Sequence, residues 1–553
     1  MSLRIRVFVW LLGILSLAVG PPFVRSGFGF ARTDRIAGFG QEKPRGFFPV
    51  SRLPAWSGRL LSGCETLQGW SVETGGGGSG RLRVWPHGVV GKAVLLDWTL
   101  AASADSWVQA RLDFNPPVDL SGTDILGISL RGSDSPSKRV SIMLADASGM
   151  FYGINLDGIN SIQRWMINPS FPFAMFYKFW DQGATLNWKH IDRLFVVVKQ
   201  PDSDATAASG SLGIDHIQVA KSESWLRQTK YYTITPNSRA AEKAVAYLLS
   251  QQQTTGLFTS WKEEELENPP PKAYLYDQAL VLLVLTRKGL RSEAERLVDF
   301  LVPRQKSDGH WARRWNPKTG EEQDDDQWVG DQAWWIFALR QYANKWSDQD
   351  AAAASKRGAA WLAKKVKSSG MVVLSTEGNV DCWWALAVTG YTKEAARIAR
   401  HLLGRVWDPK RRFWWRGDKD QMIAMDAQTW LSAFSRMPQI QRPELGMAAL
   451  SFVRRTLAAR SDNGKVFGFD GMGPVSVWCE GTAQYVACGG TDAQAYYGQL
   501  LSFQRPDGSL PGSTDRWSST AFGWLTTWSG LSGTAWFYFA STGSPWKELI
   551  SKK

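Results

Sequence analysis

The sequence predicts a multidomain protein in which an antiparallel β-sandwich (jelly roll) precedes an all-α domain, an (α/α)6 toroid. Three observations lead to this fold class. Short runs of alternating apolar residues give way to helical periodicity near residue 224. Similar helix starts then recur every 45 to 54 residues, which is typical of a repeated supersecondary unit. A chain of 553 residues is long enough for two or more domains with their own cores.

The N-terminal segment is typical of a secretory signal. Arg4 and Arg6 precede an apolar run from Val7 to Val19, which is short for a membrane span. We therefore expect residues 1–20 to be a signal peptide or an N-terminal anchor, and residues 21–60 to be a tether. The mature chain is expected to be exported, periplasmic or extracellular, with membrane association through this segment if it is not cleaved.

The predicted β-sandwich covers residues 61–225, where turn-forming residues separate many short apolar runs. This spacing favours an antiparallel sandwich. Examples of such runs are Arg81–Trp85, Ala93–Trp98, Trp107–Phe114, Ile125–Arg131, Val140–Ala145, Ile191–Val198 and Ser211–Val219.

This part resembles the galactose-binding-like jelly rolls that occur as carbohydrate-binding modules. The resemblance rests on Glu65 to Trp70, on Trp107–Leu112 and on the closing Gly213–Ile217, and it implies a fold more than a ligand. Four aromatic residues are candidates for stacking on a sugar, with packing at the sheet edge as the alternative: Phe176, Tyr177, Trp180 and Trp188.

The predicted toroid covers residues 230–548 and pairs six inner with six outer helices. The inner helices begin near Asp277, Asp331, Asp381, Asp426, Glu480 and Thr534. The outer helices are Arg239–Gln252, Arg291–Arg304, Ala351–Lys365, Lys393–Leu403, Pro443–Ala459 and Asp492–Phe503. Connections from inner to outer helices are short, and those from outer to inner helices are long, so the long loops and the acids share one face.

A recurring signature marks the ends of outer helices. Glutamine is followed four residues later by glycine and then by an apolar residue at Gln252 to Phe258, at Gln305 to Trp311 and at Gln504 to Leu510. Glycine can end a helix in the left-handed conformation. The signature therefore predicts where each outer helix turns inward.

Carboxylates at the inner-helix starts are the catalytic candidates, because glycoside hydrolysis needs one general acid and one base or nucleophile. They are Glu480, Glu377, Asp381 and Asp426. Capping of helix N-termini is the structural alternative for each. Glu480 is favoured as the acid, because Trp478 and Cys479 are apolar neighbours and Gly481 leaves room for a sugar.

Tryptophan is abundant, with 30 copies, and many lie in the long loops. Indole rings stack on sugars but also fill cores, so packing accounts for some of them. The predicted substrate-binding residues are Asp277, Asp331, Trp311, Trp315, Trp414, Trp415, Trp478, Gln484, Trp517 and Trp528.

The helical part resembles the six-hairpin glycosidase superfamily. The match lies in the ring architecture and in the strings STEGNVD (Ser375–Asp381), AMDAQTW (Ala424–Trp430) and WCEGTAQ (Trp478–Gln484). The resemblance implies a poly- or oligosaccharide substrate and an acid and base drawn from inner-helix starts, usually with inversion.

Three other functions stay open. A polysaccharide lyase would use a base such as Tyr276, Tyr485 or His310 beside Arg314. A catalytically inactive glycan-binding subunit of a polysaccharide biosynthesis or export system would bind the glycan without cleaving it. A terpene cyclase is disfavoured, because the acidic run Glu321–Asp326 lies in a polar loop.

Composition disfavours several partners. The net charge of +13 comes from scattered Lys and Arg without a recognition motif for nucleic acid. Five histidines and four cysteines show no metal-like spacing. We expect no cofactor, and a Ca²⁺ site in the acidic run is the less favoured reading of that loop.

Overall fold

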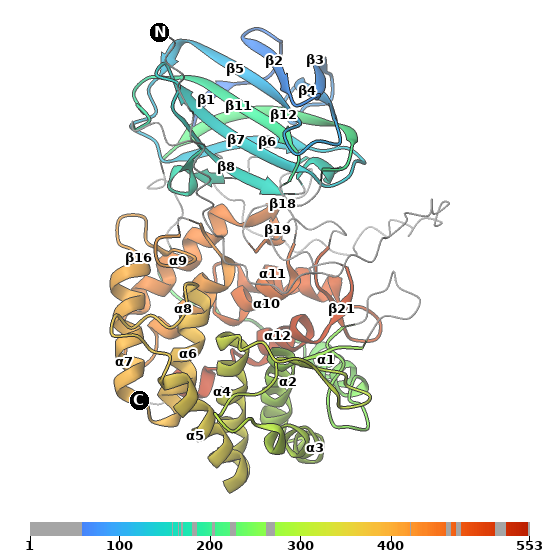
Figure 1. The fold of residues 1–553 in the computed structure, drawn as a ribbon, viewed down its shortest axis with the longest axis vertical. Helices are drawn as coiled ribbons and strands as arrows, with labels where there is room; N and C mark the ends of the chain where they lie inside the picture. Colours follow the sequence, from blue (N-terminus) through green and yellow to red (C-terminus); the bar gives the residue numbers. More distant parts are fainter. Residues whose placement is uncertain are drawn as a thin grey trace, which may run out of the picture. The chain divides into compact units, whose positions relative to one another are not determined.

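The computed structural model describes residues 58–550, apart from 158, 164, 167–169, 180–184, 202–204, 222–227, 262–270, 421, 461–465, 472–476 and 515–526. A β-sheet part is followed along the chain by a helical part (Figure 1). The expected signal segment, almost all of the tether, Trp180 and Trp517 lie outside the described residues.

The β part contains two antiparallel six-stranded sheets. One has the order β3-β4-β12-β6-β9, with β1 beside β12; the other has the order β10-β8-β7-β11-β5-β2. The first sheet comprises β1 (Arg59–Ser62), β3 (Ser79–Trp85), β4 (Ala93–Leu100), β6 (Ile125–Arg131), β9 (Ser170–Pro172) and β12 (Ala208–Ala220). The second comprises β2 (Trp70–Gly75), β5 (Trp107–Val118), β7 (Arg139–Asp146), β8 (Phe151–Asp157), β10 (Tyr177–Lys178) and β11 (Ile191–Lys199).

Alternation of side chains explains the strands. In β5, Val108, Ala110 and Leu112 are buried, whereas Gln109 and Arg111 between them are partly exposed, because neighbouring side chains point to opposite faces. All seven predicted strands are present; β1, β2, β8, β9 and β10 were not predicted.

Twelve helices of the helical part alternate along the chain between an inner and an outer set, and the short α13 (Lys547–Ile550) follows them. The inner helices are α2 (Leu275–Lys288), α4 (Val329–Trp346), α6 (Thr376–Thr389), α8 (Met425–Ser435), α10 (Cys479–Ala487) and α12 (Leu531–Thr542). The outer helices are α1 (Ser238–Ser250), α3 (Arg291–Leu301), α5 (Gln349–Ala363), α7 (Thr392–His401), α9 (Pro443–Thr456) and α11 (Ala493–Phe503).

The inner helices contact one another in cyclic order, from α2 through α4, α6, α8 and α10 to α12, which in turn contacts α2. Each outer helix packs on the inner helix next to it in the chain or, for α1, on α12: α3 on α2, α5 on α4, α7 on α6, α9 on α8, α11 on α10 and α1 on α12. In addition, α5 contacts α6 and α11 contacts α12. The inner helices are buried on nearly all sides, as in α8, where all eleven residues are buried. Among the helices of the described residues, none combines the length and the apolarity needed to cross a bilayer.

The glutamine–glycine signature joins neighbouring outer helices. Gln504 Nε2 donates to the carbonyl oxygen of Gly508 at 3.0 Å and to that of Ala240 in α1 at 2.9 Å. Gly508 has a φ of +95°, and a Cβ there would lie 2.1 Å from the carbonyl oxygen of Lys243, so only glycine fits. The same bonds run from Gln252 to Gly256 and Glu293, and from Gln305 to Gly309 and Ala354.

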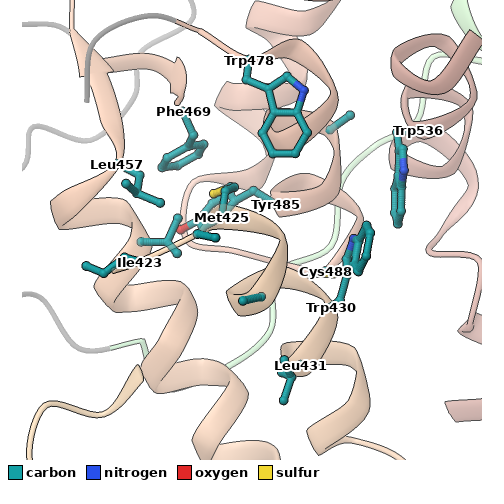
Figure 2. Close-up of a cluster of buried hydrophobic side chains, with 14 of the residues drawn as sticks. Ile423, Met425, Trp430, Leu431, Leu457, Phe469, Trp478, Tyr485, Cys488 and Trp536 are labelled. Carbon is teal, nitrogen blue, oxygen red and sulfur yellow. The ribbon is translucent and has the colours of Figure 1, made fainter. Parts of the chain in front are cut away.

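Tryptophans from different inner helices meet in the interior of the helical part. Trp430 of α8 and Trp536 of α12 face each other with ring centroids 6.3 Å apart and planes 13° apart (Figure 2). Trp546, which follows α12, is fully buried and stacks on Trp384 of α6 at 4.8 Å. Its indole also contacts Trp334 and Trp536. The segment after α12 therefore completes this core.

Candidate active site

Five inner helices carry an acidic residue in their first turn: Asp277, Asp331, Glu377, Asp426 and Glu480. Asp381 lies one turn further along α6, and α12 has no acid in its first turn.

A polar side chain near the start of each inner helix binds the backbone of the loop that leads to it. Gln332, next to Asp331, accepts a bond from the N–H of Trp311 at 2.9 Å and donates to its carbonyl oxygen at 2.6 Å. The side-chain amide of Gln278 forms the same two bonds with the backbone N–H and carbonyl oxygen of Phe258, and that of Gln428 does so with Trp414. Single bonds from the backbone N–H of Val372, Phe469 and Leu510 reach Asn379, Thr482 and Thr534.

Backbone bonds also link each helix start to the next loop. The first residue of five inner helices donates its N–H to a carbonyl oxygen of the loop before the following inner helix. The pairs are Leu275 with Arg313, Thr376 with Arg416, Met425 with Gly471, Cys479 with Gly512 and Leu531 with Ser260. Because the last pair connects α12 back to the loop before α2, the acid-bearing starts share one end of the inner helices.

The carboxylates lie close enough to influence one another. Burial, and then the charges of Asp426, Asp331 and Glu480, raise the pKa of Glu377 well above its ordinary range. Burial, Glu377 and Asp426 do the same to the pKa of Asp381. Carboxylates from α4, α6, α8 and α10 therefore converge, and they suppress one another's ionisation.

The carboxyl group of Glu480 is buried and is held by several side-chain hydrogen bonds. Its side chain is buried, and that burial raises its pKa to about 7. Hydrogen bonds from Ser532 and Tyr276 oppose this shift. The Tyr276 hydroxyl donates to Oε1 at 2.8 Å and itself accepts a bond from the Trp536 indole N–H at 3.0 Å. Gln484 Nε2 donates to the same oxygen at 3.3 Å.

Asp426 and Asp331 keep lower pKa values because positive or dipolar groups face them. Burial raises the pKa of Asp426 to about 6, against a bond from the Ala427 N–H at 2.7 Å and the nearby charge of Arg416. Burial likewise raises the pKa of Asp331 to about 6, although Arg313 Nε lies 3.2 Å from its Oδ2. The site thus combines acids that hold a proton with acids that release one.

Several predicted substrate-binding residues are packing residues in the structure. The side chains of Trp311, Trp315 and Trp414 are 0%, 1% and 0% exposed, so none of them presents an indole face to a ligand. Trp415 and Trp528 are partly exposed. The sequence could not separate these cases, because an indole at the same point of a loop can turn inward or outward.

Trp478 and Gln484 are buried, and Gln484 is the one of the two that bonds to Glu480. A Cβ on Gly481 would lie 2.3 Å from the Trp478 ring, so this glycine accommodates the indole and does not leave room for a sugar. Gln484 is fully buried and accepts a bond from Thr429 at 3.0 Å.

The aromatic candidates of the β part divide in the same way. Phe176 is buried, and Trp188 packs on Phe173 with ring centroids 4.7 Å apart. Tyr177 is exposed and stacks on Phe179 at 5.0 Å.

Two residues at the site were not among those predicted for a hydrolase; Tyr276 was considered only as the base of a lyase. Tyr276 lies beside Asp277, and its bond to Glu480 joins residues 204 positions apart in the chain, which no local pattern reveals. Trp328 precedes α4, and its side chain is half exposed; only its loop position distinguishes it in the sequence from the buried Trp315.

No protein-family model and no curated protein matches the chain. Among solved structures, it is similar to a family 11 carbohydrate-binding module from Clostridium thermocellum in complex with a β-1,3-1,4-mixed-linked tetrasaccharide. The identity is 17%, the TM-score is 0.25, and the match covers 30% of this chain and 95% of that one.

Two further likenesses involve glycan-cleaving proteins. A glycosidase variant in complex with glucose has 14% identity and a TM-score of 0.44, over 56% of this chain and 96% of its own. An alpha-amylase from Clostridium perfringens has 10% identity and a TM-score of 0.42, over 55% and 97%. Likenesses at this level carry no argument about activity, which has to rest on the site itself.

Proposed function

We propose that the protein is a glycoside hydrolase that cleaves a poly- or oligosaccharide with a pair of carboxyl groups. The observation that carries this proposal is the pairing of a buried, proton-holding Glu480 with a more readily ionised Asp426 on the neighbouring inner helix. General acid catalysis at neutral pH requires such a raised pKa. The second carboxylate is needed to activate water or to attack the sugar.

The proposed fold is an (α/α)6 toroid preceded by a jelly-roll β-sandwich. The cyclic contacts of the inner helices, and the bonds that return from α12 and α11 to the first helices, support the toroid. The two antiparallel sheets support the sandwich. On this proposal the acids line the mouth of the ring.

Glu480 would act as the general acid and Asp426 as the base. Glu377 and Asp381 are the other candidates for the base, but burial and neighbouring carboxylates hold their pKa values well above the ordinary range, which disfavours their ionised forms. Asp426 titrates near 6 and is ionised near neutral pH. With water between the base and the sugar, the reaction would invert the anomeric configuration.

A lyase is less well supported. Its base would be a tyrosine or histidine that loses a proton, but burial and the charge of Glu480 raise the pKa of Tyr276 well above its ordinary range. Burial also raises the pKa of Tyr485 well above that range. Neither tyrosine is poised to ionise.

The test is a screen of soluble polysaccharides for new reducing ends with the wild-type chain and Glu480→Gln. We expect the substitution to lower turnover by about 10²–10⁴-fold, because general acid catalysis is lost, and to leave ligand binding nearly unchanged. Equal turnover would remove Glu480 from the mechanism. Unsaturated products would favour a lyase, and binding without products would favour the inactive subunit. The anomer of the first product, read by NMR, tests inversion.

We also propose that the protein is exported across the inner membrane and meets its glycan there. The support is Arg4 and Arg6 followed by the apolar run of residues 7–19. Cell fractionation should find the mature chain outside the cytoplasm; a cytoplasmic chain would contradict export.

A further inference from the structure

Trp328 differs from every other tryptophan that the structure describes. Its side chain is 50% exposed, whereas the others are buried or partly buried. Its backbone is fixed, because it is the N-cap residue of α4 and its carbonyl oxygen accepts a bond from the N–H of Gln332. A large apolar side chain held in water on a rigid backbone points to a binding surface.

One face of Trp328 is supported by a continuous stack of side chains. The Arg313 guanidinium lies 4.2 Å from the Trp328 ring centroid and 5.5 Å from that of Tyr274. Tyr274 in turn stacks on Trp261, with centroids 4.9 Å apart and planes 10° apart. Lys272 Nζ lies 5.8 Å from the Trp261 centroid. The stack, which we name the rim stack, comprises Lys272, Trp261, Tyr274, Arg313 and Trp328.

The rim stack is tied to the carboxylate site. Arg313 Nε lies 3.2 Å from Asp331 Oδ2, and Arg313 Nη1 lies 3.8 Å from Asp324 Oδ2. The carbonyl oxygen of Arg313 also accepts the N–H of Leu275, the first residue of α2. Arg313 therefore fixes Trp328 relative to the starts of both α2 and α4, and its charge is balanced by two carboxylates.

We propose that Trp328, backed by the rim stack, is a sugar-stacking subsite that binds a neutral pyranose unit of a polymeric substrate away from the cleaved bond. This inference rests on the proposed glycan-directed function. An indole with one supported face and one exposed face matches the flat C–H face of a pyranose. Because Asp331 and Asp324 balance the charge of Arg313, this cation is not free to select an anionic sugar.

The position of Trp328 makes this a subsite for polymers. It belongs to α4, which lies opposite α10 in the cyclic order of inner helices, and α10 carries Glu480. Adjacent packed helices are about 8–10 Å apart, so one sugar ring at Glu480 does not reach across the ring of helices to Trp328. The binding affinity for a polymer should therefore depend on Trp328 more than the affinity for a disaccharide does.

The experiment compares full-length chains that all carry Glu480→Gln, so that bound glycan is not consumed. Binding is measured by calorimetry with the neutral polymers mixed-linkage β-glucan and soluble starch, and with cellobiose and maltose as short probes. We expect Trp328→Ala to weaken binding of the recognised polymer about tenfold, from the loss of one aromatic stacking contact. Trp328→Phe should retain most of the affinity, because it keeps a flat ring.

Leu374→Ala is the matched control, because Leu374 is 61% exposed and immediately precedes Ser375, the N-cap of α6. It should leave the polymer Kd unchanged. Unchanged binding by Trp328→Ala, an equal loss in the Leu374 control, or no binding of any polymer by the parent chain would each overturn the subsite.

The wild-type background separates this inference from the proposed function. There, Trp328→Ala should raise KM for polymer and leave kcat nearly unchanged. Hydrolysis by the wild-type chain with no effect of Trp328→Ala on KM or Kd would leave the hydrolase standing and remove the subsite. Weakened binding by Trp328→Ala without hydrolysis by any chain would retain the subsite and remove the hydrolase.

Discussion

At the scale of single residues, Glu480 and Asp426 differ mainly in what surrounds their carboxyl groups. Burial raises the pKa of Glu480 to about 7, and Asp426, with Arg416 nearby, titrates at about 6. If Glu480 is the acid and Asp426 the base, the plot of kcat/KM against pH should be bell-shaped, with its acidic and alkaline limbs near these two pKa values. A pH–rate profile on the identified glycan checks this, and a profile without an alkaline limb between pH 6 and 8 would contradict the assignment.

Tyr276 should set the position of the alkaline limb. Its hydroxyl donates to Glu480 and lowers the pKa of that carboxyl group. Tyr276→Phe removes the donor to Glu480 together with the acceptor of the Trp536 indole N–H, and the loss of the donor should move the alkaline limb to higher pH. A purely structural role would lower kcat/KM equally at every pH and leave the limb in place.

Glu480 should also make the folded state less stable at high pH. Its folded pKa of about 7 lies above the ordinary value of 4.5, so the folded chain holds this proton more tightly than the unfolded chain. The free energy of unfolding therefore falls as pH rises from about 4.5 through 7. Glu480→Gln should remove this loss and be more stable than wild type at pH 8 by on the order of 2–3 kcal/mol.

Urea unfolding of both chains at pH 5 and pH 8 tests the effect. Glu321→Gln, at an exposed position, is the control and should show no pH-dependent difference. A difference between wild type and Glu480→Gln that stays constant with pH would contradict the buried-acid interpretation.

The positions of the acids at the helix starts were more predictable from the sequence than the aromatic contacts. Acids such as Asp331 and Asp426 follow from a local pattern, because they open each inner helix. The burial of Trp311 and Trp414 depends on which way one side chain turns, and the bond between Tyr276 and Glu480 depends on closure of the whole set of helices. Neither is encoded in a local spacing.

At the scale of elements, the glycine in the turn that follows an outer helix should be more sensitive to substitution than a glycine that ends a helix. α11 ends at Phe503 with Gln504 as its C-cap residue, so the prediction that the signature glycine ends the outer helix is wrong. Gly508 and Gly390 both have positive φ values, +95° and +89°, but only Gly508 abuts another backbone. Gly390→Ala should cost about 1–2 kcal/mol from conformation alone. Gly508→Ala should cost clearly more, because its Cβ would meet Lys243. Equal losses in urea unfolding would contradict the role of close approach.

Element bounds were predictable because they have local causes. The predicted outer helix Lys393–Leu403 corresponds to α7, Thr392–His401, and the predicted strand Ile125–Arg131 is β6. Apolar periodicity marks both elements, and Gly390, the C-cap residue of α6, separates α7 from the helix before it. The short strands β9 and β10 were missed, because two or three residues carry too little pattern.

At the scale of the whole molecule, Trp546 joins the end of the chain to three inner helices, α4, α6 and α12. It is fully buried against Trp334, Trp384 and Trp536. Trp546→Ala should lower the free energy of unfolding by about 3–5 kcal/mol. Trp346→Ala, at a partly exposed tryptophan, should cost much less in the same urea experiment. Similar losses would contradict a central role for Trp546 in closing the core.

The bonds between the inner helices and their incoming loops have a consequence for how such a protein can diversify. Gln332 lies in the helix that the loop enters, and its side chain binds the backbone of Trp311. The two ends of the loop segment between these residues are therefore held close together. Lengthening such a loop raises the entropic cost of closing it only slowly, and it does not move Asp331. Insertions, deletions or exchanges in one loop at a time can therefore change the surface at this end of the inner helices, while the carboxyl groups keep their positions.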